Sequence, residues 1–226
     1  MIITDPKLSP SKRLFEILSV KFSVHGFNLK GSTYSKILEN RIEKIHLRFL
    51  IWGRLVSAEV SWSITFIEVE KVFNVIEDPK RKTFDPTVWN DLFNYSICKQ
   101  NRTKSEFELN DLHDNSYNDF SINLAAEQIE EVYIEIIEQY FHRHSTLEKL
   151  AAEINKTPIA YCELIKNINK RILCGLILSK MLDSNNFDYM YDQYQLFLKN
   201  SEFTEKEKYI LDLKRYSDIL TKNYSN

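Results

Sequence analysis

The scarcity of glycine and proline constrains the fold of this chain more than any other feature of its sequence. Its 226 residues include only 4 glycines and 5 prolines. A sandwich, barrel or propeller needs many tight turns, and tight turns draw heavily on these two residues. Three of the four glycines lie between residues 26 and 53, so the sharp turns are concentrated there. We therefore predict that long helices carry much of the remaining length.

The region around these glycines has the two-residue period of a half-buried sheet. Apolar residues alternate with other residues in two runs, one on each side of Gly53: Ile45, Leu47, Phe49 and Ile51, then Val60, Trp62, Ile64 and Phe66. This pattern predicts an antiparallel hairpin with one wet face. A further strand is expected at about 28–38, with a turn at Glu39-Asn40. The alternation of apolar residues over 120–124 predicts a last strand that returns to the sheet.

Periods of three and four residues indicate helices on both sides of the strands. Ser9-Pro10 starts a first helix, a second covers about 68–77, and residues 87–97 also have a helical pattern. The sharpest pattern is an apolar stripe after residue 125: Ile129, Val132, Tyr133, Ile136, Ile137, Tyr140 and Phe141. Further helices are predicted to start at Ser145, at Thr157-Pro158, at Phe187 and at Thr204.

The order of these elements predicts an α+β fold: an N-terminal helix, an antiparallel sheet of about three to four strands, then a mainly helical C-terminal half. We expect an α+β sheet region over residues 1–124 and a helical region over 125–226, packed as one compact unit. A chain of this length can bury about 70% of its unfolded surface in one core, so neither a disulfide nor a metal is needed for stability.

Charge, cysteines and hydropathy narrow the class of protein. The 30 basic and 32 acidic residues give a formal net charge of -2, which argues against nucleic acid and membrane surfaces as partners. The three cysteines form no C-x-x-C pair, so we expect reduced thiols. The first residues lack the basic start and apolar run of a signal peptide, and the longest apolar run, 172–178, is too short to span a membrane. We expect a cytoplasmic protein that does not enter the membrane.

The familiar catalytic and nucleotide-binding motifs are absent from the sequence. It has no Walker A loop, no G-x-G-x-x-G, no G-x-S-x-G elbow and no H-E-x-x-H. Glu138 and His142 would share a helix face, but no second cluster supplies a further ligand, so we predict no metal site and no cofactor. His113-Asp114 could form an acid–base pair, but it lacks a nucleophile and a solvated loop explains it better. We assign no catalytic residues.

Surface patterns favour binding to another protein. Five glutamates lie opposite the apolar stripe and would attract a basic partner: Glu127, Glu130, Glu131, Glu135 and Glu138. An ordinary solvated helix face is the alternative explanation. The aromatic residues of 187–198 exceed one buried stripe, so Tyr189 and Phe197 are further candidates for partner contact, although core packing explains most of that set. The basic run at 80–82 is explained by a solvated loop.

Part of the chain resembles a known family. The helix end His25-Gly26-Phe27 with Lys30 and Tyr34, the hairpin, and the helix Val69-Glu70-Lys71-Val72 resemble the bacterial domain-of-unknown-function family 4304. The similarity continues at the 129–141 helix and at the helix start over 145–150, so it covers about residues 9–155. Residues 78–118 depart from the compact form of that family. The resemblance implies a fold, and it carries no catalytic residues over to this chain.

Two hypotheses of function follow from these patterns. The first is a non-enzymatic cytosolic protein-binding protein, of the kind represented by immunity proteins that neutralise bacterial toxins, because an acidic helix face is present and catalytic motifs are absent. The second is a small-ligand-binding protein or enzyme whose site is assembled in three dimensions between sheet and helices, with His113, Asp114, Glu138 and His142 as the residues to examine. A third hypothesis is an assembly role through self-association of the C-terminal helices. The sequence does not determine the oligomeric state.

Overall fold

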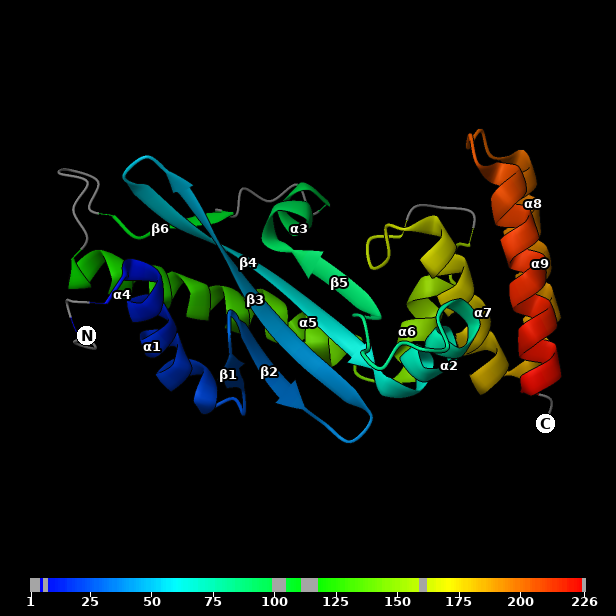
Figure 1. Ribbon diagram of the computed structural model, residues 1–226, viewed down its shortest axis with the longest axis horizontal. Helices are drawn as coiled ribbons and strands as arrows, with labels where there is room; N and C mark the ends of the chain where they lie inside the picture. The colour runs from blue at the N-terminus through cyan, green and yellow to red at the C-terminus, as the bar shows by residue number, and fades with distance from the viewer. Residues whose placement is uncertain (1–4, 6–7, 99–104, 111–117, 159–161, 225–226) are drawn as a thin grey trace. The chain divides into compact units, whose positions relative to one another are not determined.

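The computed structural model of the chain describes residues 5, 8–98, 105–110, 118–158 and 162–224 (Figure 1). The chain folds into two compact units, unit 1 from Met1–Ile64 and Trp89–His142, and unit 2 from Thr65–Val88 and Arg143–Asn226. The chain therefore passes from one unit to the other three times. The boundary predicted between residues 124 and 125 falls inside a helix of unit 1.

An antiparallel sheet of six strands forms the frame of unit 1. Its strands are β1 (Asn28–Lys30), β2 (Thr33–Ile37), β3 (Arg41–Trp52), β4 (Leu55–Phe66), β5 (Val88–Asp91) and β6 (Glu106–Glu108). The order is β1-β2-β3-β4-β5, and β6 also pairs with β4. The predicted hairpin is confirmed as β3 and β4. The sheet has more strands than the three to four predicted, because β5 and β6 are short and the strand expected at 28–38 is divided at Gly31, whose φ of 64° makes a turn.

The helices of unit 1 are α1 (Pro10–Ser23), α3 (Leu92–Cys98), α4 (Asp119–Val132), a π-helical turn η1 (Tyr133–Ile137) and α5 (Glu138–Arg143). The Ser9 side chain caps α1, and the Asn118 side chain caps α4 by accepting from the N–H of Ser121 at 2.8 Å. The strand predicted at 120–124 is wrong, because this cap starts a helix there. Ile122 is buried while Phe120 and Leu124 are 63% and 42% exposed, so the three side chains do not share a face.

The core of unit 1 lies between the inner face of the sheet and helices α1, α4 and α5. The ring centroids of Phe22 on α1 and Tyr34 on β2 are 4.9 Å apart, and those of Trp62 on β4 and Tyr140 on α5 are 5.9 Å apart. All seven residues of the apolar stripe over 129–141 are buried, as predicted. An ion pair between Arg13 and Asp119 joins α1 to α4. The helices therefore cover one face of the sheet and leave the outer face to polar side chains.

Unit 2 is a helical bundle. Its helices are α2 (Ile67–Glu77), α6 (Leu147–Ile154), α7 (Ile168–Leu182), the short 3-10 turn η2 (Ser184–Asn186), α8 (Phe187–Asn200) and α9 (Lys206–Asn223). Residues 172–178 of α7 are all buried, and α7 contacts α2, α6, α8 and α9, so α7 is the central helix of the unit. None of the helices in the described ranges has both the length and the apolar character needed to cross a membrane.

Several helix starts in the sequence prediction are wrong in unit 2. The helix expected from Thr157-Pro158 begins at Ile168, where the Asn167 side chain caps it by accepting from the N–H of Lys170 at 2.9 Å. The guanidinium of Arg171, within this helix, donates to the carbonyl of Thr157 at 2.7 Å. Thr146 caps α6 in place of Ser145, and α9 begins at Lys206 without a side-chain cap.

Candidate functional site

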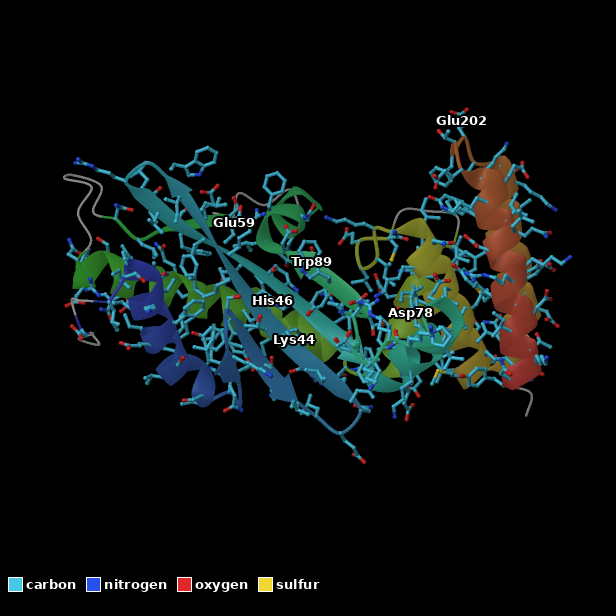
Figure 2. All side chains as sticks on the ribbon, in the orientation of Figure 1. Lys44, His46, Glu59, Asp78, Trp89 and Glu202 are labelled. Carbon is cyan, nitrogen blue, oxygen red and sulfur yellow. The ribbon has the colours of Figure 1, made fainter. Side chains whose placement is uncertain are left out.

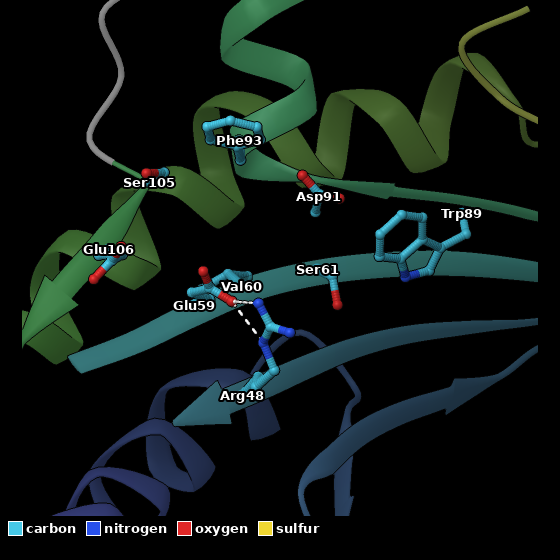
Figure 3. Close-up of a pocket in the computed structure, with 9 residues that line it drawn as sticks. All are labelled: Arg48, Glu59, Val60, Ser61, Trp89, Asp91, Phe93, Ser105 and Glu106. Atoms are coloured by element: carbon cyan, nitrogen blue, oxygen red, sulfur yellow. Dashed lines mark hydrogen bonds and ion pairs between the residues drawn. The ribbon is translucent and has the colours of Figure 1, made fainter. Parts of the chain in front are cut away.

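A pocket of about 510 Å³ opens on the outer face of the unit 1 sheet (Figure 3). The described residues that line it come from β3, β4, β5, α3 and the start of β6: Arg48, Glu59, Val60, Ser61, Trp89, Asp91, Phe93, Ser105 and Glu106. A volume of several hundred Å³ is typical of pockets that receive a small molecule or a side chain of a partner. These residues belong to segments far apart in the sequence, so only the fold brings them together.

The pocket lies where β4 exchanges one neighbouring strand for another. Strand β6 pairs with β4 at residues 57–59, and Glu59 opposite Glu106 is the last of these pairs. Beyond that point β5 is the neighbour of β4. The end of β5 at Asp91 and the start of β6 at Glu106 therefore both border the segment that holds Ser61. The change of neighbour leaves a hollow over β4 that side chains from both short strands surround (Figure 3).

Strand alternation aims the functional side chains into this pocket. Leu47, Val60 and Val88 are buried on the inner face of the sheet, so the residues next to them in β3, β4 and β5 face outward. Trp89 is 38% exposed and Phe93, at the start of α3, is 60% exposed. Two aromatic rings thus line the pocket without being withdrawn into the core.

Negative charge prevails among the described lining residues, with the carboxylates of Glu59, Asp91 and Glu106 against the guanidinium of Arg48. Hydrogen bonds hold these carboxylates in place. Glu59 Oε2 accepts from Arg48 Nε at 2.7 Å, Glu106 Oε2 accepts from the Ser57 hydroxyl at 2.9 Å, and Asp91 accepts from the N–H of Asn94 at 2.7 Å. A site with several carboxylates and exposed aromatic rings suits an organic cation, which gains charge-assisted hydrogen bonds and cation–π contacts.

A row of polar side chains that includes His46 crosses the outer face of the sheet (Figure 2). His46 Nδ1 lies 3.0 Å from the Thr33 hydroxyl, and its Nε2 lies 3.3 Å from the hydroxyl of Ser63. Burial, reinforced by the charge of Lys44, lowers the pKa of His46, so the ring is neutral near pH 7. Ser63 is fully buried, which keeps a substrate away from its hydroxyl. We interpret this row as a cross-strand hydrogen-bond ladder that stiffens the sheet.

The acidic row predicted at 127–138 is largely exposed on α4, η1 and α5. Glu127, Glu131, Glu135 and Glu138 face solvent, whereas Glu130 is half-buried and accepts from Lys21 Nζ at 2.5 Å. Glu130 therefore joins α4 to α1, and the other four form the exposed acidic face. None of the five glutamates lines the pocket.

The aromatic candidates lie in unit 2. Tyr189 is exposed on α8, while Phe197 is half-buried and packs edge-on against Phe203 with ring centroids 5.8 Å apart. Phe187, Met190, Tyr194 and Leu198 are buried, in agreement with the core role expected for most of this set.

Two of the four residues proposed for an assembled catalytic site are described by the structure, and neither of these lines the pocket. Glu138 and His142 are exposed on α5 and line no part of the pocket, and His113 and Asp114 lie outside the described residues. Among the residues that the structure describes, no group of three or more His, Cys, Asp or Glu side chains could hold a metal ion. The basic run at 80–82 is exposed, and Arg81 pairs with Asp85 at 2.6 Å.

Sequence reasoning missed most residues of the pocket. The wet face of the β3–β4 hairpin was predicted, and Arg48, Glu59 and Ser61 follow from it, but nothing in the hairpin marks them as a site. A helix over 87–97 was predicted where β5 precedes α3, which hid Trp89 and Asp91. The burial of β5 alternates over its four positions, but its sequence, two apolar residues followed by two polar ones, does not show this alternation.

The chain matches no protein-family model, no curated protein and no solved structure.

Proposed function

We propose that the chain is a non-enzymatic protein-binding protein whose unit 1 takes a basic side chain of a protein partner into the outer-face pocket. The observation that carries the proposal is the pocket itself, where Trp89 and Phe93 stand beside the carboxylates of Glu59, Asp91 and Glu106. A cation over an aromatic ring contributes about 0.5–2 kcal/mol, depending on how far it is desolvated. Hydrogen bonds from the same cation to carboxylates add to this and restrict its orientation.

Two features favour a protein partner over a free small molecule. The pocket is open, since Arg48 and Phe93 are largely exposed at its margin, so much of a small ligand would remain in water. Unit 1 also carries the exposed glutamates Glu127, Glu131, Glu135 and Glu138, whose negative charge would attract a basic protein and speed the encounter. A partner with several basic side chains gains from both features.

The biological role that fits such a surface is neutralisation of a toxin in the cytoplasm. Toxins that act on nucleic acids use Lys and Arg to hold phosphates, so an inhibitor that occludes their active site needs carboxylates. Membership of the bacterial domain-of-unknown-function family 4304 is part of the same proposal and rests on the residues quoted for it, such as His25-Gly26-Phe27. The proposed localisation is cytoplasmic.

A second candidate function is binding of a small organic cation such as a diamine. The volume of about 510 Å³ favours it, because it falls within the range of pockets that receive small molecules. This candidate makes the pocket sufficient for binding, whereas the first needs neighbouring surface as well.

Fluorescence-anisotropy titration with labelled nonapeptides tests the proposal. One peptide alternates Arg and Gly, and its partner alternates Glu and Gly. We expect the basic peptide alone to bind, and Trp89→Ala to weaken that binding about 10-fold. Trp52→Ala is the matched control, because Trp52 is an exposed tryptophan that does not line the pocket and its removal should leave affinity unchanged.

Competition with agmatine separates the two candidate functions. If the ligand is a protein partner, the basic peptide should bind much more tightly than agmatine. Equal affinities of the chain for the peptide and for agmatine would favour the small cation. Equal binding of the basic and acidic peptides, or equal affinities for Trp89→Ala and the wild type, would contradict both. Circular dichroism of each variant confirms that it is folded.

A further inference from the structure

A guanidinium, that of Arg48, already lies at the margin of the pocket. Its side chain extends from β3 across to Glu59 on β4, where two of its nitrogens converge on the single oxygen Oε2 (Figure 3). Among the described residues, this guanidinium bonds to Glu59 alone. Arg48 therefore marks a position beside the pocket where a cation is held.

The hold on Arg48 is weak. Its side chain is 74% exposed, and the Glu59 side chain is 28% exposed. Exposed ion pairs contribute little to stability, since water and salt screen them and a long side chain must be ordered to form them. Because both nitrogens share Oε2, the fork of the guanidinium does not use both oxygens of the carboxylate. Arg48 can leave Glu59 with little loss of free energy, and its exposed side chain has room to move away.

We propose that Arg48 is a built-in competitor for Glu59 at the margin of the pocket, and that the partner group which displaces it is the guanidinium of an arginine. This inference rests on the proposed function. An arginine from a partner can use both oxygens of Glu59 in the bidentate geometry. Glu106 lines the same pocket as a further acceptor, and Asp91, whose two oxygens already accept from Asn94, adds negative charge. A lysine ammonium is a compact point charge that cannot form this bidentate contact.

Competition from Arg48 gives the site a modest selectivity. A cation that enters must replace the bond between Arg48 and Glu59. An arginine that bonds to both oxygens of Glu59 makes a stronger bond than the one it replaces, whereas a cation that forms a single bond makes one of similar strength.

Isothermal titration of the full chain with Nα-acetyl-arginine amide and Nα-acetyl-lysine amide tests this inference. We expect the arginine compound to bind about 5-fold more tightly than the lysine compound. Arg48→Ala should tighten binding of the arginine compound about 3-fold, since it removes the competing cation. Glu59→Gln should weaken it about 10-fold. Arg81→Ala is the matched control, because it removes the same charge from an exposed ion pair of unit 2.

The outcomes distinguish this inference from the proposed function. If Arg48→Ala weakens binding or leaves it unchanged while the wild type still binds the basic nonapeptide, the displacement mechanism is overturned and the proposed function stands. If Arg81→Ala tightens binding as much as Arg48→Ala, the effect is one of net charge and the mechanism is again overturned. If the wild type binds neither probe, the proposed function fails and this inference with it. A shift of the Arg48 Nε–H resonance on addition of the arginine compound supports displacement directly.

Discussion

Gly175 of α7 provides the sharpest test of packing in unit 2. A Cβ atom at this position would overlap the hydroxyl of Tyr194 and would lie 2.6 Å from Oδ1 of Asn155 and 2.8 Å from Cζ of Tyr194. All of these separations are shorter than ordinary van der Waals contact. Tyr194 is fully buried, so its ring has no free space into which it can move. We expect Gly175→Ala to destabilise the fold.

The atoms that would be displaced belong to a buried hydrogen-bond network. The Tyr194 hydroxyl donates to Asn155 Oδ1 at 3.0 Å, and Asn155 Nδ2 donates to the carbonyl of Gly175 at 3.2 Å. The Ser179 hydroxyl donates to the same carbonyl at 2.9 Å. This network joins the end of α6 to α7 and α8, so a side chain at position 175 disturbs three helices at once.

The magnitude follows from three contributions. Overpacking of a well-filled core costs about 1–3 kcal/mol, and loss of one buried hydrogen bond costs about 1 kcal/mol more. Replacing glycine by alanine inside a helix returns about 1 kcal/mol through the lower conformational entropy of the unfolded chain. We therefore expect Gly175→Ala to lower the free energy of unfolding by about 1–3 kcal/mol.

Urea unfolding followed by circular dichroism measures this change. In a Tyr194→Phe background the hydroxyl is absent, so Gly175→Ala should cost about 1 kcal/mol less than in the wild type. Asp218→Ala, at an exposed position of α9, is the control and should leave the midpoint unchanged. If Gly175→Ala raises the free energy of unfolding by about 1 kcal/mol, as at an unhindered helical glycine, the packing argument is refuted. Equal costs in the two backgrounds would refute the role of the hydroxyl.

Two further predictions concern buried polar groups. Glu70 is 1% exposed, its carboxylate lies 3.6 Å from Lys170 Nζ, and burial raises its pKa above 4.5 despite that lysine. The stability linked to this raised pKa is present below the pKa of the unfolded chain and is lost as pH rises through the pKa of the folded protein. The free energy of unfolding of Glu70→Gln should therefore increase relative to that of the wild type as pH rises above 4.5. A difference between the two proteins in thermal unfolding that does not change with pH would contradict this. Asn110 accepts from the N–H of Val56 at 2.7 Å and donates to the carbonyl of Arg54 at 2.9 Å. Asn110→Ala leaves both backbone groups without these bonds, so it should lower the free energy of unfolding by about 1–3 kcal/mol. Hydrogen exchange of the Val56 amide should become faster, and unchanged exchange would count against this role of Asn110.

The short-range features of the fold could be predicted because each is written into a few neighbouring residues. The alternation over 45–66 follows from a strand whose two faces meet different surroundings, and the structure confirms the hairpin. The stripe from Ile129 to Phe141 follows in the same way from a helix with one buried face. The Ser9-Pro10 start of α1 is equally local, because the cap bonds within its own first turn.

The errors arise where the deciding contact comes from a distant residue or from a competing local one. At 120–124 the apolar alternation is real, but the Asn118 cap and the helix-spaced burial of Ile122, Ala125 and Ala126 outweigh it. Thr157 does not start the helix predicted there, and its carbonyl accepts from the guanidinium of Arg171, 14 residues later in the chain. No window of neighbouring residues contains that information.

What the sequence by itself determined is the α+β class, the central hairpin and the helical C-terminal half, together with the acidic row on 127–138. Only the tertiary structure decided where the pocket lies. It forms because β6 pairs with β4 at Glu59 and β5 takes over beyond it, which brings Trp89 and Glu106 next to residues 30 to 50 positions earlier in the chain. Local periodicity reports which face of an element is buried, and it carries no information about which strand becomes the neighbour.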